Sequence, residues 1–328
     1  ETREMSVNGV SFTVQFNPSR ILSTGAKLDA KSIQQRPCFL CRENQPVEQK
    51  VIEAAEGYHL CVNPYPILPG HVTIPSVCHT RQEIPTDFFK VLEELFITLP
   101  QGYAVFYNGA YSGASAPDHL HYQGAPQCHI PLIAQYAQWK DTKEAINEHI
   151  YYIKDYACPL FAIEWSGNIP AIDLTDVLKL FPKSSEEWEP KLNLLAWKEG
   201  QKNILVIIPR GKHRPDCYFA EGASQRMISP GALDMAGIIV TPRKEDFDKI
   251  NAELEAYSPR ILRKPQIVAA NKIDQLDDLE EDEKYLEFKE YVESKGYQVF
   301  PMSAPLNMGV KEVLAAALLE LQKIEENP

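Results

Sequence analysis

The segment 112–124 reads SGASAPDHLHYQG and places two histidines two residues apart behind a loop of small residues. In an extended strand alternate residues face the same way, so His119, His121 and Gln123 are expected on one face. Backbone N–H groups in a loop with small side chains are accessible to phosphate. The pattern favours phosphate chemistry, and the alternative is a pair of hydrogen-bonded core histidines.

His121 has the surroundings of a nucleophile. A neutral imidazole can attack phosphorus and form a covalent phosphoramidate, which divides one transfer into two easier steps. Such a site must hold the ring in one tautomer and take up charge on the phosphate oxygens. The loop that contains Gly113 and Ser115 precedes His121, and the Gln123 amide shares its face. We therefore predict that Gly113 belongs to the substrate-binding loop.

Two cysteines have the spacing of a metal site. Cys38 and Cys41 form a C-x-x-C, and His79 and His119 would complete a closed Cys₂His₂ set, which is typical of structural zinc. His71 is the alternative fourth ligand. A redox C-x-x-C or a pair of reduced, half-buried cysteines is the competing interpretation, although the strand and helix of a redox motif are missing around it.

Composition limits the protein class. The 328 residues suffice for two or more domains of ~150 residues, and 44% hydrophobic residues can build a core. A net charge of −12 argues against nucleic acid and anionic membranes as partners. No apolar run approaches the ~20 residues of a membrane span, and the polar start does not resemble a signal peptide. Seven cysteines with one C-x-x-C favour a reducing compartment, so we expect a cytoplasmic protein.

The chain reads as an α+β domain, 1–245, followed by a smaller α/β segment, 246–328. Within the domain we expect strands in 10–16, 58–75, 102–111 and 192–215, helices in 85–99 and 141–157, and a helix followed by a strand in 229–242. The similar patterns of 58–75 and 192–215 suggest two related halves, 1–130 and 150–245. In the smaller segment we expect strands in 261–274 and 298–304 that alternate with helices in 282–297 and 309–324, which predicts a parallel sheet.

SGASAPDHLHYQ resembles the histidine triad superfamily, in the branch of galactose-1-phosphate uridylyltransferase, dinucleoside tetraphosphate phosphorylase and the GDP-hexose phosphorylases. The family fold is an antiparallel sheet with flanking helices. The second histidine of its S-x-x-H-x-H-x-Q segment is the nucleophile, which implies that His121 becomes nucleotidylated. Gln123 and Ser115 are then expected to contact the phosphates, and Asn108 to lie near the transferred phosphoryl group.

The resemblance covers roughly residues 5–245 and implies further roles. The uridylyltransferase binds zinc through a C-x-x-C and two histidines that match the four candidate ligands here. Asn63 matches a position that touches the nucleotide, and Arg210 or Lys212 would bind the incoming phosphate or sugar phosphate. Asp118 departs from the pattern, because the uridylyltransferases have proline before the first histidine. The CFLC…ASAPDHLH pattern is also similar to an uncharacterised group of proteins from gut Bacteroidetes.

The segment 246–325 resembles the second half of an Obg-type GTPase domain. Its residues similar to the guanine-specifying N-K-x-D and S-A segments are Asn271, Lys272, Asp274, Ser303 and Ala304. No G-x-x-x-x-G-K-[ST] phosphate loop occurs in the sequence, so a base-reading loop alone should not bind GTP well or hydrolyse it. We interpret the segment as a partial, vestigial G-domain that supplies packing or a partner surface.

These observations predict a nucleotidyltransferase or phosphorylase with structural zinc. Its substrate would be a nucleoside diphosphate sugar or a dinucleoside polyphosphate, its acceptor phosphate or a sugar phosphate, and its assembly is compatible with a homodimer. The alternatives are a GTP-binding regulatory protein of the Obg class and a catalytically silent nucleotide-binding module.

Overall fold

The computed structural model describes the chain except residues 8, 26–28, 171, 258–266, 272, 277, 280, 295, 305 and 327–328. Two compact units divide it, a larger one, Thr2–Leu254, and a smaller one within Glu255–Pro328. The predicted domain boundary at 245/246 falls inside helix α8 (Lys244–Tyr257).

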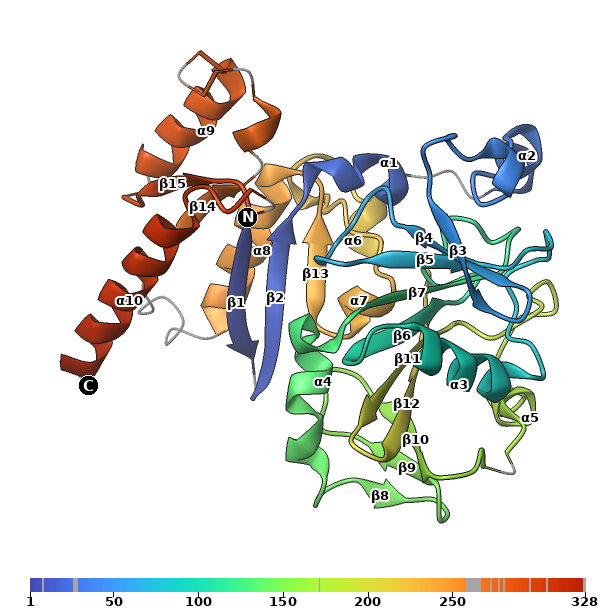
Figure 1. The fold of residues 1–328 in the computed structure, drawn as a ribbon. Coiled ribbons are helices and arrows are strands. Elements are labelled where there is room, and N and C mark those ends of the chain that lie inside the picture. Colours follow the sequence, from blue (N-terminus) through green and yellow to red (C-terminus); the bar gives the residue numbers. More distant parts are fainter. Residues whose placement is uncertain are drawn as a thin grey trace. The chain divides into compact units, whose positions relative to one another are not determined.

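An antiparallel ten-stranded sheet forms the centre of the larger unit, in the order β3-β4-β5-β7-β6-β11-β12-β10-β9-β8 (Figure 1). Its strands are β3 (Val51–Ala55), β4 (Tyr58–Val62), β5 (Val72–Pro75), β6 (Tyr103–Asn108), β7 (His121–Pro126), β8 (Glu144–Ala145), β9 (Ile150–Ile153), β10 (Leu160–Ser166), β11 (Leu192–Glu199) and β12 (Lys202–Pro209). The predicted antiparallel sheet is therefore confirmed, and the segments 1–130 and 150–245 both contribute strands to this single sheet.

A second, three-stranded sheet has the order β1-β2-β13. It comprises β1 (Thr2–Val7), β2 (Val10–Phe16) and β13 (Ile238–Thr241), with β1 antiparallel and β13 parallel to β2. The strand expected in 10–16 is β2.

Short helices and turns connect the strands. The α-helices of the larger unit before α8 are α1 (Ile21–Thr24), α2 (Ala30–Gln35), α3 (Phe88–Thr98), α4 (Pro131–Gln135), α5 (Leu174–Leu178), α6 (Asp216–Phe219) and α7 (Ala232–Met235). The 3₁₀ turns are η1 (Pro18–Arg20), η2 (Arg42–Asn44), η3 (Gln127–His129), η4 (Tyr136–Trp139) and η5 (Gly222–Ser224). The helices expected in 85–99 and 229–242 correspond to α3 and α7.

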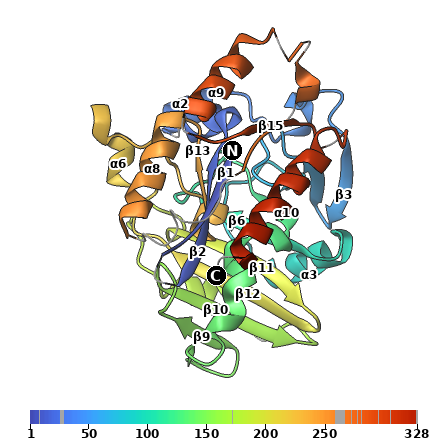
Figure 2. The ribbon, with the colours of Figure 1, turned by 90° about the vertical axis from the view of Figure 1, so that its left-hand side faces the viewer.

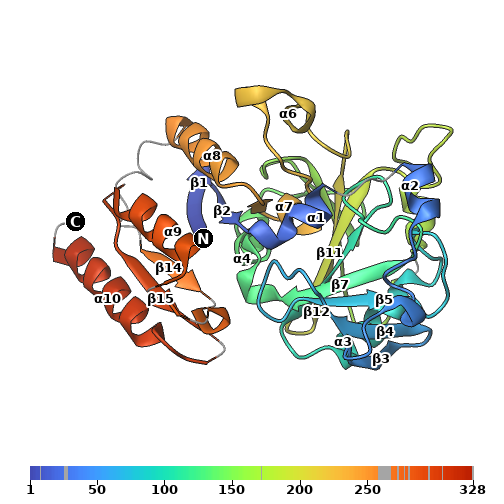
Figure 3. The same ribbon diagram turned by 90° about the horizontal axis from the view of Figure 1, so that it is seen from above.

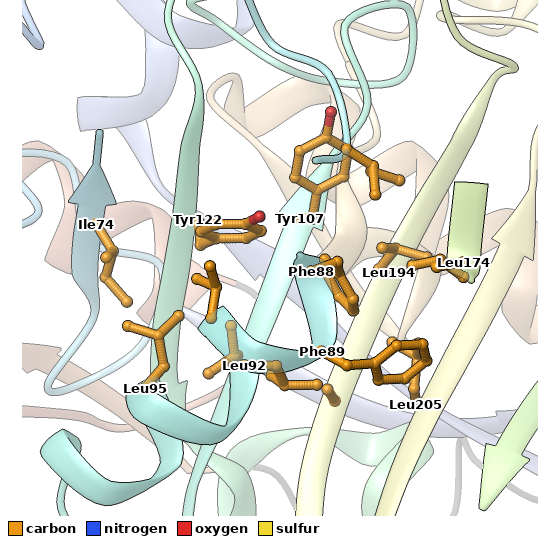
Figure 4. Close-up of a cluster of buried hydrophobic side chains, with 14 of the residues drawn as sticks. Ile74, Phe88, Phe89, Leu92, Leu95, Tyr107, Tyr122, Leu174, Leu194 and Leu205 are labelled. Atoms are coloured by element: carbon orange, nitrogen blue, oxygen red, sulfur yellow. The ribbon is translucent and has the colours of Figure 1, made fainter. Parts of the chain in front are cut away.

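Each face of the large sheet carries its own hydrophobic core. On one face α3 packs against the sheet, and Figure 4 shows this cluster with Ile74, Phe88, Phe89, Leu92, Leu95, Tyr107, Tyr122, Leu174, Leu194 and Leu205 labelled. On the other face, residues of α4, α7 and β13 cover the sheet, and α7 lies beside β11 (Figure 3). Because strand residues alternate between these cores, membership of a core assigns each site residue to a face.

The helix predicted in 141–157 is wrong, because this segment folds as strands β8 and β9. The Asn147 side chain accepts hydrogen bonds from the N–H groups of His149 (2.9 Å) and Ile150 (2.7 Å), which turns the chain between the strands. Strand β9 then pairs with β10, where Ile150 lies opposite Ile163. Tertiary pairing and an Asx-type turn therefore override the helical charge pattern.

The smaller unit contains a parallel pair, β14 (Val268–Asn271) and β15 (Val299–Met302), together with the 3₁₀ turn η7 (Ile273–Gln275). Helices α9 (Glu283–Ser294) and α10 (Val310–Glu326) both contact β15 (Figure 2). The alternating strands and helices expected here are confirmed. None of the helices in the described part of the chain combines the length and the hydrophobicity of a membrane span.

Candidate functional site

Three of the predicted site residues, His121, Gln123 and Asn108, lie in the middle of the large sheet. Tyr122 belongs to the core under α3, whereas Ala125 belongs to the opposite core. Because side chains alternate along β7, His121 and Gln123 face away from α3. Asn108 at the end of β6 lies on the same face, since Phe106 also packs there. The structure thus brings these three side chains to one side of two adjacent strands.

The His121 ring has a defined tautomer. Its Nδ1 lies 2.8 Å from the carbonyl oxygen of His119, and a carbonyl can only accept, so Nδ1 carries the proton. Nε2 therefore holds the lone pair. Burial lowers the pKa of His121 to about 4, and the side chain is 4% exposed, so the imidazole is neutral near pH 7. A neutral ring with its lone pair on Nε2 is the form that a nucleophile requires.

Gln82 holds the strand ends around His121, and nothing in the sequence marked it. The β6–β7 register ends where Phe106 pairs with Gln123, so Asn108 and His121 lack ladder partners on each other's strand. The Gln82 amide fills this gap: Nε2 donates to the carbonyls of Asn108 (2.8 Å) and His121 (3.1 Å), and Oε1 accepts from His121 N–H (2.8 Å). The side chain is 0% exposed.

The Gln123 amide is oriented by His71. The N–H group of Ile67 donates to His71 Nδ1 at 3.1 Å, and burial lowers the pKa of His71 to about 4. The neutral ring therefore carries its proton on Nε2, which donates to Gln123 Oε1 at 2.8 Å. This bond fixes which end of the Gln123 amide is the oxygen and leaves its NH₂ group to contact an anion.

Asn108 is similarly constrained. Its Oδ1 accepts hydrogen bonds from Ala232 N–H (2.6 Å) and from Asn193 Nδ2 (3.1 Å). Asn193 lies opposite Asn108 in β11, and its own Oδ1 accepts from Arg210 Nη1 at 2.7 Å. With Oδ1 used twice, the NH₂ group is the part of the Asn108 side chain that can donate to a further group.

The Arg210 side chain is hydrogen-bonded to other residues of the protein. Both of its NH₂ groups donate to protein acceptors, namely the Asn193 side chain and the carbonyls of Pro230, Lys212 and His213. The Lys212 side chain is exposed and pairs with Asp216 at 2.6 Å. Neither predicted cation therefore presents an uncommitted charge to the site in this structure.

The small-residue loop approaches a neighbouring backbone closely at Gly113. Its φ is +98°, and a Cβ there would lie 2.7 Å from Gly231 Cα and 2.8 Å from the Pro230 carbonyl oxygen. Glycine is required both by this left-handed conformation and by the close contact. Ser115, further along the loop, accepts a hydrogen bond at its carbonyl from Arg36 Nη2 at 3.2 Å.

Asn63 lies just after β4, and β4 pairs with β5. Its Nδ2 donates to Thr73 Oγ1 and its Oδ1 accepts from Tyr65 N–H, both at 2.9 Å. Thr73 pairs with Gln123 across β5 and β7. The structure thus places Asn63 two strands away from the His121 strand.

A buried carboxyl group, which the sequence also did not mark, supports the loop after β6. Glu189 is 3% exposed and accepts hydrogen bonds from Tyr107 Oη (2.9 and 3.0 Å) and Ala110 N–H (2.6 Å). Burial raises the pKa of Glu189 to about 7.

The four predicted metal ligands form a cluster. The donor atoms of Cys38, Cys41, His79 and His119 all lie within 4.8 Å of one another. Cys38 Sγ is 3.3 Å from His119 Nδ1, and Cys41 Sγ is 3.1 Å from His79 Nδ1. A tetrahedral ion with bonds of ~2.3 Å to sulfur and ~2.05 Å to nitrogen would separate such donors by roughly 3.5 Å, so the set fits a metal ion.

The protein also orients these ligands. His119 Nε2 lies 2.9 Å from the Ser76 carbonyl oxygen and must donate to it, which leaves the Nδ1 lone pair directed at the sulfurs. His71, the alternative fourth ligand, is not part of the cluster because its ring contacts Gln123 instead. In the protein alone, burial and the neighbouring Cys38 raise the pKa of the Cys41 thiol to about 11, and a bound dication would lower it.

In the smaller unit, the structure joins the two segments that resemble the guanine-specifying segments of a GTPase. Asn271, at the end of β14, accepts a hydrogen bond from Ala304 N–H at 3.1 Å. Asp274 is exposed and Ser303 is buried. Lys272 lies outside the described residues.

The fold is similar to that of a solved nucleotide phosphorylase. Yeast Ap4A phosphorylase Apa2 shares it over 80% of this chain and 85% of that chain, with a TM-score of 0.52 and 17% identity. The same yeast enzyme in complex with Ap4A matches with a TM-score of 0.51 and 16% identity, over 80% of this chain and 88% of that one.

Sequence comparison gives two partial matches. A family model described as "Domain of unknown function (DUF4922)" matches residues 1–126, which include the metal cluster, His121 and Gln123. GTPase Obg from Caldicellulosiruptor bescii is 39% identical over 155 residues, and GTPase Obg from Clostridioides difficile 40% over 151. Each match covers 42% of this chain, a larger share than the segment 246–325, but only about a third of the GTPase (34% and 33%).

Proposed function

We propose that the protein is a nucleotidyltransferase of the phosphorylase type that works through a covalent nucleotidyl-His121 intermediate. The observation that carries this proposal is the His121 ring, which is neutral and holds its lone pair on Nε2. The fold shared with a nucleotide phosphorylase supports it. The substrate in this proposal is a nucleoside diphosphate sugar or a dinucleoside polyphosphate.

The reaction would proceed in two displacements. His121 Nε2 attacks the α-phosphorus, a P–N bond forms, and the P–O bond to the next phosphate breaks, so that the leaving phosphate takes the electron pair. An oxygen of phosphate or of a sugar phosphate then attacks the same phosphorus and returns the electron pair to Nε2. The Nδ1–H bond to the His119 carbonyl remains throughout and stabilises the positive ring of the intermediate.

Neighbouring groups would take up the phosphate charge. The Gln123 and Asn108 amides are both held by their oxygens, so each presents an NH₂ donor on the face of His121. Gly113 and Ser115 would contribute backbone N–H groups from the small-residue loop, and Asn63 would contact the nucleotide. In this proposal Arg210 positions Asn193 and thereby Asn108, and Lys212 is the side chain that could exchange its exposed carboxylate partner for the acceptor phosphate.

We further propose that the metal ion is Zn²⁺, with a structural role. Two thiolates and two imidazoles fill four positions, which leaves none for a substrate. The ion would fix the first histidine of the motif and so anchor the start of β7. Metal analysis should find about one zinc per chain, as a single closed site implies, and Cys38→Ser should lose it.

Mass spectrometry tests the function directly. The protein is incubated with a panel of nucleoside diphosphate sugars and dinucleoside polyphosphates, including Ap4A, and the nucleotidylated peptide is mapped. We expect the adduct on His121, and His121→Ala should lose the adduct while zinc content and unfolding are retained. An adduct on His119, or near-normal turnover by His121→Ala, would overturn the mechanism. Nucleotide binding without any adduct would favour the silent binding module.

The smaller unit keeps one contact between the segments that resemble a G-domain. The hydrogen bond from Ala304 N–H to Asn271 joins the two segments that resemble a guanine-binding loop. We propose that this contact is a remnant of the G-domain packing, because the chain has no phosphate loop to hold GTP.

A further inference from the structure

Asp118 has two charged neighbours on different sides of its carboxylate. Arg36 Nη2 donates to Oδ1 at 3.0 Å, and His79 Nε2 lies 3.8 Å from Oδ2. The Asp118 side chain is only 19% exposed. The carboxylate therefore lies between a guanidinium group and one of the four metal ligands.

The two ring nitrogens of His79 face different groups, and this connects Asp118 to the metal cluster. Its Nδ1 lies 3.1 Å from Cys41 Sγ and is the nitrogen that faces the metal cluster. A histidine that binds a metal through Nδ1 carries its proton on Nε2, and here Nε2 faces Asp118. At 3.8 Å the contact is an ion-pair distance and not a hydrogen bond, and the carboxylate attracts the Nε2–H end of the ring, which favours this orientation of the ligand. His119 is oriented by a direct hydrogen bond to the Ser76 carbonyl, at 2.9 Å.

Arg36 extends the connection to the small-residue loop. The same Nη2 group that donates to Asp118 also donates to the Ser115 carbonyl at 3.2 Å. The guanidinium carbon lies 5.0 Å from the centre of the Phe39 ring, which belongs to the C-x-x-C segment. Arg36 also offsets the negative charge that Asp118 would otherwise add beside two thiolates. One side chain thus joins the metal segment, the carboxylate and the loop.

We propose that Asp118 is an outer-sphere carboxylate of the metal site and that Arg36 transmits metal binding to the loop 112–115. The proposal rests on the metal site proposed above. Neither residue would touch the ion or the substrate, so both are positioning residues.

Metal affinity tests the first part. Purified full-length chains are loaded with Zn²⁺ and titrated with a competing chelator. Loss of an outer-sphere partner typically weakens metal binding by about 10- to 100-fold, so Asp118→Asn should lose zinc at correspondingly lower chelator activity. Glu83→Gln is the control: it removes one negative charge four residues after His79 in the sequence, and the partner of that charge is Arg81 at 2.6 Å. This control should bind zinc as the unsubstituted chain does.

Hydrogen exchange tests the second part without reference to activity. In the unsubstituted chain, removing zinc should speed exchange of the loop amides. In zinc-saturated Arg36→Gln the loop should already exchange at the faster rate, whereas zinc-saturated Glu83→Gln should not. Equal zinc affinity in Asp118→Asn and the unsubstituted chain, or a loop in Arg36→Gln that still responds to zinc normally, overturns the proposal. If the unsubstituted chain binds no zinc, both this proposal and the metal site are wrong.

Discussion

Replacing Gln82 by methionine should cost far more stability than the same change at Gln135. The two glutamines make the same set of bonds, two donated to carbonyls and one accepted from a backbone N–H. They differ in burial, since Gln82 is 0% exposed whereas the Gln135 bonds to Ser11 are open to solvent. Water can replace the lost partner only at Gln135.

The structure sets the magnitude. Gln82→Met leaves three buried backbone groups, on Asn108 and His121, without partners, and each such group costs about 1–3 kcal/mol. The expected loss in unfolding free energy is therefore about 3 kcal/mol or more. At Gln135 water replaces the two exposed bonds to Ser11, so only the part-buried bond to the Pro131 carbonyl counts, and Gln135→Met should lose about 1 kcal/mol.

Urea unfolding followed by tryptophan fluorescence is the appropriate assay, because all four tryptophans lie in the larger unit. Zinc occupancy is matched among the variants, so that metal loss does not enter the comparison. Equal losses for the two substitutions would refute the argument, since they would show that burial of the Gln82 amide contributes nothing.

Three further predictions concern the loop, the pH and the smaller unit. Gly113→Ala should destabilise the larger unit by about 1–3 kcal/mol in the same assay, because its φ of +98° is unfavourable for alanine and the Cβ would meet Gly231; an unchanged midpoint would contradict this. The pKa of His71 is about 4 when folded against 6.5 for the free side chain, so the unfolded chain binds this proton first as the pH falls. Stability should fall between about pH 6.5 and 4, by up to about 3 kcal/mol from this residue, and His71→Gln should make that fall smaller by this amount in urea titrations at several pH values. GTP should not bind with micromolar affinity; calorimetry that found such binding, abolished in Asp274→Asn, would disprove this.

Local pattern predicted the elements well where hydrophobic periodicity was regular. The strand alternation of 112–124 placed His121 and Gln123 together, but β7 begins at His121, so His119 lies before the strand and not on its face. The helical spacing of 85–99 matched α3. The spacing of the C-x-x-C with two histidines also predicted the four-donor cluster. The helix prediction for 141–157 failed because the Asn147 side chain forms a turn there, and neither the charge pattern nor the hydrophobic pattern of the sequence indicates such side-chain hydrogen bonds.

The residues that hold the site residues in place could not be predicted from local sequence patterns. Gln82 lies 39 residues from His121 in sequence, and Glu189 lies 79 residues from Ala110. Their roles depend on where two strands stop pairing and on which backbone groups are then left unsatisfied. Arg210 shows the same limit, because a basic residue in a loop reads as a phosphate ligand until its acceptors are known.

Helix α8 determines where the chain can be shortened without disturbing the larger unit. Asp246, Phe247, Ile250 and Asn251 are all buried, and their spacing forms one stripe along the helix. Asp246 also accepts hydrogen bonds from Arg243 and from the N–H of Met227. Inserting one residue between Phe247 and Ile250 would rotate the rest of α8 by ~100° and break this stripe. A chain shortened to end at residue 245 would lose the stripe altogether, whereas one that ends at Leu254 would keep it.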